Sequence, residues 1–483
     1  MSPDRLQYIV SAESSLELSG SYDKKKHSKQ NTMSNLPIVP AGSSYLYRQL
    51  QALYRRLFSG NSKENELGSA LTTLESLQSQ IKSAGGDLDR NKRASLLKAA
   101  RNLVQALEKP EEAVFRQSFE THTRSLCIRL AVDLRIFHIL VARDGQPITS
   151  SELAAECGAE ELFIARIMRI LTSLSYASES GSIPPSYLAT PLSKACTIPH
   201  LEAYIVHTYE HAARVTLSMP AYFKLHGYKS PTDGSNGPFQ YALGTKLPYF
   251  DYLHADPVKS DRFNICMNGN KGTRRHWVDW YPVDTLLESF DQQKAEVEDA
   301  KVVGEEPVFL VDMGGGNGKH LQVLLRKFPQ VSGHLVLQDL PGTIKALEEG
   351  SHDNLLDKGI RPMAHDIFSP QPLKGAKTYY THFLLHDFPD DKCREMLQHV
   401  AAAMTPGGYS RLLLNEIVLP STRCPSFFAA ADITMMAVLA GMQRTKEQWV
   451  ELVESAGLTV AQVWKSPDEG DFEGIVEAIV GKE

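Results

Sequence analysis

The chain has 483 residues, of which 42% are hydrophobic and 22% charged, and its formal net charge is −6. This composition is typical of a globular protein with about two to four domains, and the acidic balance gives no electrostatic reason to expect binding to nucleic acid or to an anionic membrane. The six cysteines form no Cys-x-x-Cys pair, and no apolar run reaches the ~18 residues of a membrane span. We therefore expect a cytoplasmic protein without a disulfide framework.

The first 110 residues carry no chemical motif. Residues 1–42 are rich in Ser, Lys and Asn, and we expect them to remain a disordered tail. Residues 43–110 place leucines at helical spacing, which predicts N-terminal helices that pack or assist oligomerisation.

Residues 111–200 are expected to form a compact helical unit. The segment ITSSE at 148–152 is typical of the capped start of a helix. A further helix and a short wing at 182–188 complete a winged-helix layout, which also occurs in DNA-binding proteins. The helix that would enter the DNA groove carries only Arg166 and Arg169 among apolar residues, so we favour a role in dimerisation.

Residues 201–304 connect this unit to the last domain. The segment is mostly helical and rich in aromatic side chains, so we expect a helical linker that also contributes to a substrate pocket. It ends in an acidic run at 291–299, which we interpret as a solvated connection.

Residues 305–483 alternate apolar strands with helical segments. This alternation predicts an α/β fold, an open and mostly parallel sheet with helices on both faces. Ligands in such sheets bind beyond the carboxyl ends of the strands, so polar side chains at those ends are the candidate site residues. The expected strands lie at 308–313, 333–338, 361–365, 377–385, 409–418, near 458–464 and near 473–480.

The first of these strands runs into a glycine-rich turn, VDMGGGNGKH at 311–320. Glycines allow the backbone to approach a ligand closely, and the following helix offers free N–H groups at its N-terminus. The acid before the turn, Asp312, suits a cationic or N–H-bearing ligand better than a pyrophosphate. Asp339 ends the second strand, about 20 residues further on, where a ribose-binding carboxylate is expected.

Three more polar residues lie at or just after the ends of strands. Asp366 could accept a hydrogen bond from the exocyclic amine of a base, or could cap a helix N-terminus. His386 could remove a proton from a weakly acidic hydroxyl, or could be structural. Glu416, at the end of the fifth strand, would orient that imidazole if it lay nearby and would otherwise be a solvated acid. We expect Asp387 only to cap the following helix.

With these residues in place, the chain resembles the plant-type, caffeate-like family of S-adenosylmethionine-dependent O-methyltransferases, in its fungal secondary-metabolism branch. The resemblance covers about residues 110–480 and rests on several ordered motifs: VDMGGGNGKH, QDLP, HDIF, FLLHDFPDDKC, LLLNEIVLP, DITMMAVLAGMQRT and EQWVELVESAGL. It implies a Rossmann-like class I methyltransferase domain at 305–483, preceded by a mostly α-helical winged-helix dimerisation domain at 111–200. It also implies a homodimer that uses S-adenosyl-L-methionine.

The resemblance implies a role for each site residue. His386 would be the general base that deprotonates a phenol or enol, and Glu416 would position it. The residues implied in cofactor binding are Asp312, Gly314 and Gly316 near the methionine part, Asp339 and Leu340 at the ribose, Asp366 and Ile367 at the adenine, and His382 nearby. The residues implied in or beside the acceptor pocket are Met267, Phe383, Asp432 and Met435.

Two positions depart from the family pattern. Gln443 replaces an acid that precedes Arg444-Thr445, so the histidine lacks a second carboxylate partner. The Gln443 amide can still hydrogen-bond a ring N–H, but it supplies no charge. His382 replaces a lysine four residues before the histidine. These changes leave room for weakened methyl transfer or for another use of the bound cofactor.

We therefore expect O-methylation of a phenolic or enolic hydroxyl on a small polyketide-like or phenolic metabolite. One alternative is a pericyclase or dehydratase of the same fold that does not transfer the methyl group. The other is a winged-helix regulator that senses a small ligand. No His/Asp/Glu cluster has the spacing of metal ligands, so no metal is expected.

Overall fold

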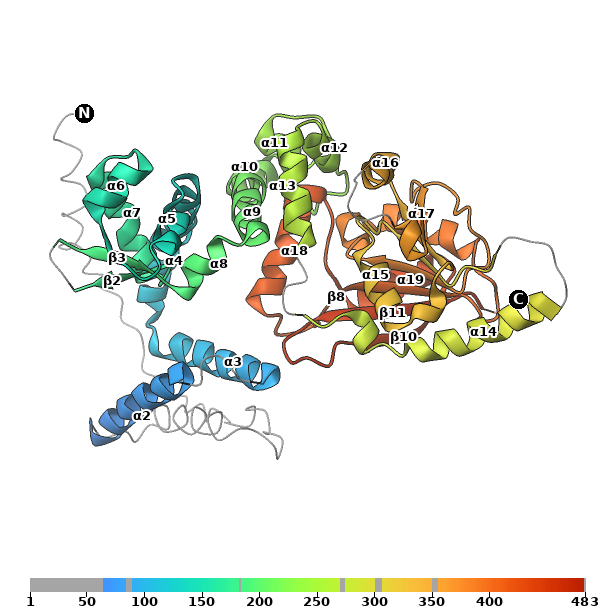
Figure 1. Ribbon diagram of the computed structural model, residues 1–483, viewed down its shortest axis with the longest axis horizontal. Helices are drawn as coiled ribbons and strands as arrows, with labels where there is room; N and C mark the ends of the chain where they lie inside the picture. Colours follow the sequence, from blue (N-terminus) through green and yellow to red (C-terminus); the bar gives the residue numbers. More distant parts are fainter. Residues whose placement is uncertain are drawn as a thin grey trace, which may run out of the picture. The chain divides into compact units, whose positions relative to one another are not determined.

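The computed structural model describes residues 64–83, 89–181, 184–269, 274–299, 306–349 and 355–481 (Figure 1). The tail expected at 1–42 lies outside these residues. Residues 74–483 form one compact unit, which starts within helix α2 (Glu64–Ser83). Within this unit, helix α3 (Arg90–Leu107) begins where the Asp89 side chain accepts a hydrogen bond from the Lys92 amide.

Residues 110–196 form the helical unit expected from the sequence. The Thr149 side chain accepts a hydrogen bond from the Glu152 amide, and the Glu152 carboxylate accepts one from the Thr149 amide, so helix α6 begins with a capping box. Three short strands pair antiparallel in the order β1-β3-β2. The elements are α4 (Pro110–Asp133), α5 (Ile136–Ala142), β1 (Ile148–Thr149), α6 (Ser150–Cys157), α7 (Glu161–Ser173), β2 (Ala177–Ser180), β3 (Ser186–Ala189) and α8 (Pro191–Cys196).

The segment after this unit is helical around an aromatic core that includes Phe239 and Tyr249. Helix α18 (Ser426–Leu439), from much later in the chain, packs into the same core through Ala437 and Val438. The helices of the segment are α9 (Pro199–Thr208), the π-helical turn η3 (Tyr209–Ala213), α10 (Arg214–His226), α11 (Pro238–Leu243), α12 (Tyr249–His254), α13 (Pro257–Asn268), η4 (Trp277–Asp279) and α14 (Val283–Asp299).

The carboxyl-terminal region forms the predicted α/β sheet, in which all seven expected strands are present. The strand order is β10-β11-β8-β7-β4-β5-β6, and neighbours from β8 to β6 are parallel. Strand β11 runs antiparallel to β8 and β10. A two-residue strand that was not expected, β9 (Arg444–Thr445), pairs with β8. The other strands are β4 (Leu310–Met313), β5 (Leu335–Asp339), β6 (Ile360–Ala364), β7 (Thr378–His382), β8 (Arg411–Leu419), β10 (Thr459–Lys465) and β11 (Glu473–Ile479).

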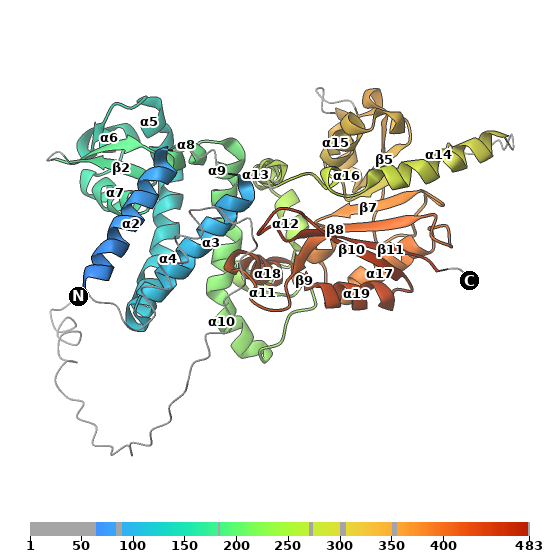
Figure 2. The same cartoon turned by 90° about the horizontal axis from the view of Figure 1, so that it is seen from below.

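Helices cover both faces of this sheet (Figure 2). Successive residues of a strand point to opposite faces, so Tyr379 belongs to one apolar core and Tyr380 to the other. The helices over the Tyr379 face are α17 (Asp390–Ala401) and α19 (Lys446–Ser455), and those over the Tyr380 face are α14, α15 (Lys319–Lys327) and α16 (Pro341–Glu349).

Two strand ends differ from those expected. Strand β7 ends at His382 because Phe383 has a φ of +50°, which turns the chain out of the sheet. Strand β8 continues to Leu419, so Glu416 lies inside the strand and pairs with Gly474 of β11. Glu416 is therefore a fully buried acid and not a solvated one.

Candidate active site

The glycine turn after β4 places a buried carboxylate beside a closely packed backbone. Asp312 is 1% exposed, and neither of its side-chain oxygens accepts a hydrogen bond from a described residue. Burial, followed by the charge of Asp339, raises the pKa of Asp312 to about 8. A Cβ at Gly315 would lie 2.3 Å from Leu337 and 2.7 Å from the Asp312 carboxylate, so this position requires glycine.

Asp339 joins the end of β5 to the same turn. Its Oδ2 accepts a hydrogen bond from the Gly316 amide at 2.9 Å, and its Oδ1 accepts one from the Leu340 amide at 2.8 Å. Gly314 and Gly316 both have a positive φ, 70° and 58°, which favours glycine. Leu340 is 46% exposed, so its side chain is open to a ligand beside the Asp339 carboxylate.

Asp366 follows β6, the parallel neighbour of β5. Its Oδ1 accepts a hydrogen bond from the Phe368 amide at 3.0 Å, so it stabilises a turn and does not cap a helix. The Asp366 side chain is exposed, whereas Ile367 is half-buried against the core. Both residues stand at the same edge of the sheet as Asp339.

Further along this edge, β7 and β8 bring a histidine and a glutamate together. His386 lies in the 3-10 turn η7 (Leu385–Asp387), and its Nδ1 is 2.8 Å from Glu416 Oε2. The other oxygen of Glu416, Oε1, accepts hydrogen bonds from the amides of Leu384 and Leu385 at 2.9 and 2.8 Å. These bonds hold the Glu416 carboxylate in place, and the carboxylate in turn orients the imidazole.

Asp387 has a role that the sequence prediction missed. It does not cap α17, whose N-cap is Pro389; its Oδ1 lies 3.3 Å from His386 Nε2. Burial on its own would lower the pKa of His386, but the charges of Glu416 and Asp387 outweigh burial and raise this pKa to about 10. The interpretation that Gln443 leaves the histidine without a second carboxylate is therefore wrong, because Asp387 supplies one.

Gln443 contacts the site through its backbone. Its amide N–H donates to Asp432 Oδ1 at 2.8 Å, while its buried side-chain Oε1 has no hydrogen-bond partner among the described residues. The neighbouring Met442 amide donates to the His386 carbonyl at 2.9 Å. A Cβ at Gly441 would lie 2.1 Å from that carbonyl oxygen, so the segment is packed directly against the His386 turn.

Arg444 is a further residue that the sequence prediction did not single out. It is fully buried, and it donates to Asp390 Oδ1 at 2.9 and 2.7 Å and to the carbonyls of Leu385 and Phe388 at 3.2 and 3.0 Å. Its guanidinium also lies 5.0 Å from the centre of the Trp449 ring. Arg444 thus ties both sides of the His386 turn to β9. Its partners are far away in the sequence, so no local pattern indicates this role.

His382 and Phe383 lie between the glycine turn and His386. Their rings stack at 4.1 Å, and the Phe383 ring is 5.6 Å from the His386 ring. His382 is also 4.1 Å from the ring of His320, which belongs to the first turn of α15. The guanidinium of Arg274 lies 5.0 Å over the Phe383 ring. His382 therefore stands near the glycine turn, and Phe383 stands near the histidine.

Three residues predicted in or beside the acceptor pocket lie on helices. Asp432 and Met435 are half-buried on α18, which contacts the His386 turn η7. Burial raises the pKa of Asp432. Met267 lies on α13 and is 37% exposed, and its place in the pocket stays a prediction.

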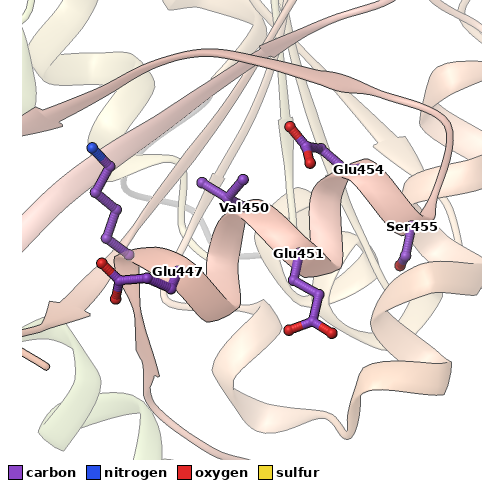
Figure 3. A pocket seen from close by; sticks show the side chains of 6 residues that line it. Glu447, Val450, Glu451, Glu454 and Ser455 are labelled. Carbon is purple, nitrogen blue, oxygen red and sulfur yellow. The ribbon is translucent and has the colours of Figure 1, made fainter.

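A separate hollow of about 500 Å³ lies along helix α19 and involves none of the residues above (Figure 3). Three of its side chains are carboxylates, and all of its lining residues come from one helix: Lys446, Glu447, Val450, Glu451, Glu454 and Ser455. Within the described ranges, no group of His, Cys, Asp and Glu is arranged to hold a metal ion. None of the described helices combines the length and apolar character that crossing a bilayer requires.

Comparison with known proteins matches both parts of the chain. A family model described as an O-methyltransferase domain matches residues 283–459, and one described as an O-methyltransferase dimerisation domain matches residues 117–198. The O-methyltransferase penC of Penicillium thymicola is 36% identical over 85% of this chain and 96% of its own length. The O-methyltransferase asqD of Emericella nidulans is 38% identical over 75% of this chain and 88% of its own length.

Two solved structures have a similar fold along most of the chain. LepI in complex with SAM matches with a TM-score of 0.72 and 26% identity, over 85% of this chain and 99% of the LepI chain. A pericyclic reaction enzyme matches with the same TM-score and identity, over 85% of this chain and all of its own.

Proposed function

This chain belongs to the O-methyltransferase family, and we propose that it methylates a phenolic or enolic hydroxyl of a small polyketide-like or phenolic compound, with His386 as the general base. It is an S-adenosyl-L-methionine-dependent enzyme of secondary metabolism. The observation that carries the assignment of roles is the 2.8 Å pair of His386 and Glu416, at the same edge of the sheet as the glycine turn.

The residues around the glycine turn fit S-adenosyl-L-methionine, which supplies, when bound, a methyl group on a positively charged sulfur. The buried oxygens of Asp312 have no partner among the described residues, so they can accept hydrogen bonds from an ammonium group. A nearby cation would also lower the raised pKa of this carboxyl. We assign the methionine part to Asp312, Gly314 and Gly316, the ribose to Asp339 and Leu340, the adenine to Asp366 and Ile367, and a contact beside the turn to His382.

His386 would act at the acceptor oxygen. Glu416 holds Nδ1 at 2.8 Å, so Nε2, which lies 3.3 Å from Asp387 Oδ1, is the nitrogen that would meet the acceptor. Because the two carboxylates stabilise the imidazolium, the neutral ring is a stronger base than an ordinary histidine. The proton of the acceptor hydroxyl would reside on Nε2 while the oxygen attacks. Such general-base assistance contributes roughly 10²–10⁴-fold.

The acceptor would lie against Phe383, with Met435, Asp432 and Met267 around it. The Phe383 ring stands 5.6 Å from the His386 ring, and an aromatic acceptor could contact the edge of this ring close to the base. Gln443 would complete the site, because its buried Oε1 is open to a hydrogen bond from a second acceptor hydroxyl.

We also propose that the protein is a homodimer through the dimerisation domain. Phe115 and Phe119 lie one helical turn apart on α4 and are 65% and 69% exposed. Large exposed apolar side chains on one face of a helix are typical of an interface. Light scattering after size exclusion should give the mass of two chains, and the mass of one chain would contradict this proposal.

The test of the proposed reaction is transfer of a labelled methyl group from S-adenosyl-L-methionine to a panel of phenolic and enolic compounds. Mass spectrometry should find an O-methylated product together with an equal amount of S-adenosylhomocysteine. A complete lack of both, from protein that binds the cofactor by calorimetry, would contradict the proposed function.

A second reaction is favoured by the similarity to a pericyclic reaction enzyme. The raised pKa of His386 means that its ring can donate a hydrogen bond from a charged nitrogen, which suits promotion of dehydration or pericyclisation. Such a reaction would form no S-adenosylhomocysteine. Product that appears without S-adenosylhomocysteine would therefore support this second candidate over methyl transfer.

A further inference from the structure

The methionine part of S-adenosyl-L-methionine carries an ammonium and a carboxylate besides the charged sulfur. Asp312 fits the ammonium, but a carboxylate needs hydrogen-bond donors. The backbone amides of all four glycines in the turn already donate within the chain. Gly314 and Gly315 donate to the Gln338 carbonyl at 2.8 and 3.2 Å, Gly316 to Asp339 Oδ2 at 2.9 Å, and Gly318 to the Gly315 carbonyl at 3.0 Å. We therefore expect the carboxylate to meet a side-chain donor.

The residue at the end of β7 does not supply a permanent charge. The family pattern has a lysine there, whereas this chain has His382, and a histidine is charged only in part near neutral pH. Lys319 begins α15 beside the glycine turn, but it is exposed. The Lys319 amide is also used within the chain, because it donates to Asn317 Oδ1 at 3.2 Å.

Arg274 brings a permanent positive charge to this strand end. Its guanidinium lies 5.0 Å from the centre of the Phe383 ring, and its Nη1 lies 3.7 Å from Glu473 Oε2. The other oxygen of Glu473 lies 3.8 Å from His382 Nε2, so Arg274 and His382 share one buried carboxylate. A guanidinium has five N–H donors, so Arg274 can contact Glu473 and a ligand carboxylate together.

The segment that carries Arg274 is anchored beside the strand that carries Asp312. Trp277, three residues after Arg274, is 1% exposed and stacks on the Tyr380 ring at 4.8 Å. Tyr380 pairs in register with Asp312 on the neighbouring parallel strand. Burial, followed by the charge of Asp312, raises the pKa of Tyr380, which agrees with this closeness. Arg274 and Asp312 therefore belong to the same region of the sheet edge.

We propose that Arg274 binds the carboxylate of the cofactor's methionine part, so that Arg274 and Asp312 hold its two charged groups. The proposal rests on the proposed function only through the cofactor, so it applies to methyl transfer and to the second candidate reaction alike. Arginine suits this role because its planar guanidinium can donate two parallel hydrogen bonds to one carboxylate. Two such charge pairs fix the methionine part and thereby orient the sulfur that carries the methyl group.

The experiment compares two ligands by calorimetry: S-adenosyl-L-methionine and its decarboxylated form, which keeps the ammonium and the charged sulfur. The wild type should bind the complete cofactor about 10–100-fold more tightly. Arg274→Met should abolish this preference by weakening the binding of the complete cofactor. The affinity for the decarboxylated form should not fall, because the arginine charge repels that ligand. A wild type without the preference, or an Arg274→Met variant that keeps it, would overturn the proposal.

Two further variants show whether the effect is specific to Arg274. Arg326→Met removes an exposed arginine in the last turn of α15 and should keep the wild-type preference. Lys319→Met removes the cation at the start of the same helix and should keep the preference as well. Loss of the preference in Lys319→Met, together with its retention in Arg274→Met, would assign the carboxylate to Lys319 and refute the proposal.

A double variant separates binding from folding. Arg274→Met leaves the buried Glu473 carboxylate without its arginine partner, which lowers stability. In Arg274→Met/Glu473→Gln this uncompensated charge is removed, and the preference for the complete cofactor should still be lost. A double variant that recovers the wild-type preference would show that Arg274 acts only by neutralising Glu473.

The outcome for Arg274 is independent of the outcome for the proposed reaction. A wild type that prefers the complete cofactor through Arg274, yet forms no methylated product from any acceptor, would contradict the proposed methylation alone. A wild type that methylates an acceptor, yet binds both ligands with equal affinity, would contradict the role of Arg274 alone.

Discussion

The two ends of the candidate active site each contain a buried carboxylate, and the two carboxylates differ in their hydrogen-bond partners. At the glycine turn, Asp312 is buried without a hydrogen-bond partner among the described residues, and burial raises its pKa to about 8. At the histidine, Glu416 is equally buried but has three hydrogen-bond partners. An unsatisfied buried polar group costs about 1–3 kcal/mol. We infer that the first end is shaped for a cationic ligand, whereas the second is organised by the chain itself.

The largest expected effect is that of a substitution at His386, which should change catalysis but not cofactor binding. His386→Ala should lower kcat by about 10²–10⁴-fold, because the general base is lost. The affinity for S-adenosyl-L-methionine, measured by calorimetry, should stay unchanged because the glycine turn is intact. His399→Ala, a half-buried histidine on α17, serves as the matched control. Equal loss of cofactor affinity in His386→Ala would mean that the two ends are not independent.

Glu416→Gln tests whether the histidine end depends on the buried charge. We expect kcat to fall by about 10²-fold, because the amide can still accept the two backbone hydrogen bonds but no longer stabilises the imidazolium. The pKa of His386 in the folded protein is raised to about 10, so protonation of His386 stabilises the fold. This contribution to the free energy of unfolding is complete below the unfolded pKa near 6.5 and disappears as the pH rises through about 10.

Urea unfolding at neutral pH and above pH ~10 measures this contribution. The wild type should lose more stability between the two conditions than Glu416→Gln. Identical losses in the two proteins would show that Glu416 is not the main cause of the raised His386 pKa.

Asp312→Asn tests the glycine-turn end of the site. We expect this substitution to stabilise the ligand-free protein, whereas Glu416→Gln removes a stabilising charge. The folded pKa of Asp312 is raised to about 8, so its burial destabilises the ligand-free protein increasingly as the pH rises from about 4 toward 8. The amide removes this cost, so we expect a gain of about 1 kcal/mol at neutral pH and a loss of roughly tenfold in cofactor affinity. Thermal unfolding with and without S-adenosyl-L-methionine measures both. A loss of stability in the ligand-free variant would contradict the assignment of an uncompensated carboxylate.

The smallest effect concerns Gln443. Gln443→Glu restores an acid at this position, but Asp387 already supplies the second carboxylate at the histidine, so kcat should change by less than about tenfold. Stability should fall by about 1 kcal/mol, because the new carboxylate would be buried. A hundredfold gain in kcat would show that Asp387 does not take over the role of the missing acid.

Much of this arrangement could be predicted from the amino-acid sequence. The strands follow from apolar runs, the helix start at Thr149 from a local capping pattern, and the carboxylates around the glycine turn from their positions at the ends of strands. The proximity of His386 and Glu416 followed only from the resemblance to a family. Each of these features depends on neighbouring residues or on a motif that is continuous in the chain.

The contacts that set the chemistry at the histidine depend on how distant segments meet. Arg444 lies 54 residues from Asp390, and the approach of Gly441 to the His386 carbonyl depends on α18 and β9 packing beside η7. Asp387 is adjacent in sequence, yet the turn directs it to the ring and not to the helix that follows. Hydrogen-bond direction is sensitive to small rotations of the backbone, and those rotations are fixed only when the sheet and the packed helices are assembled.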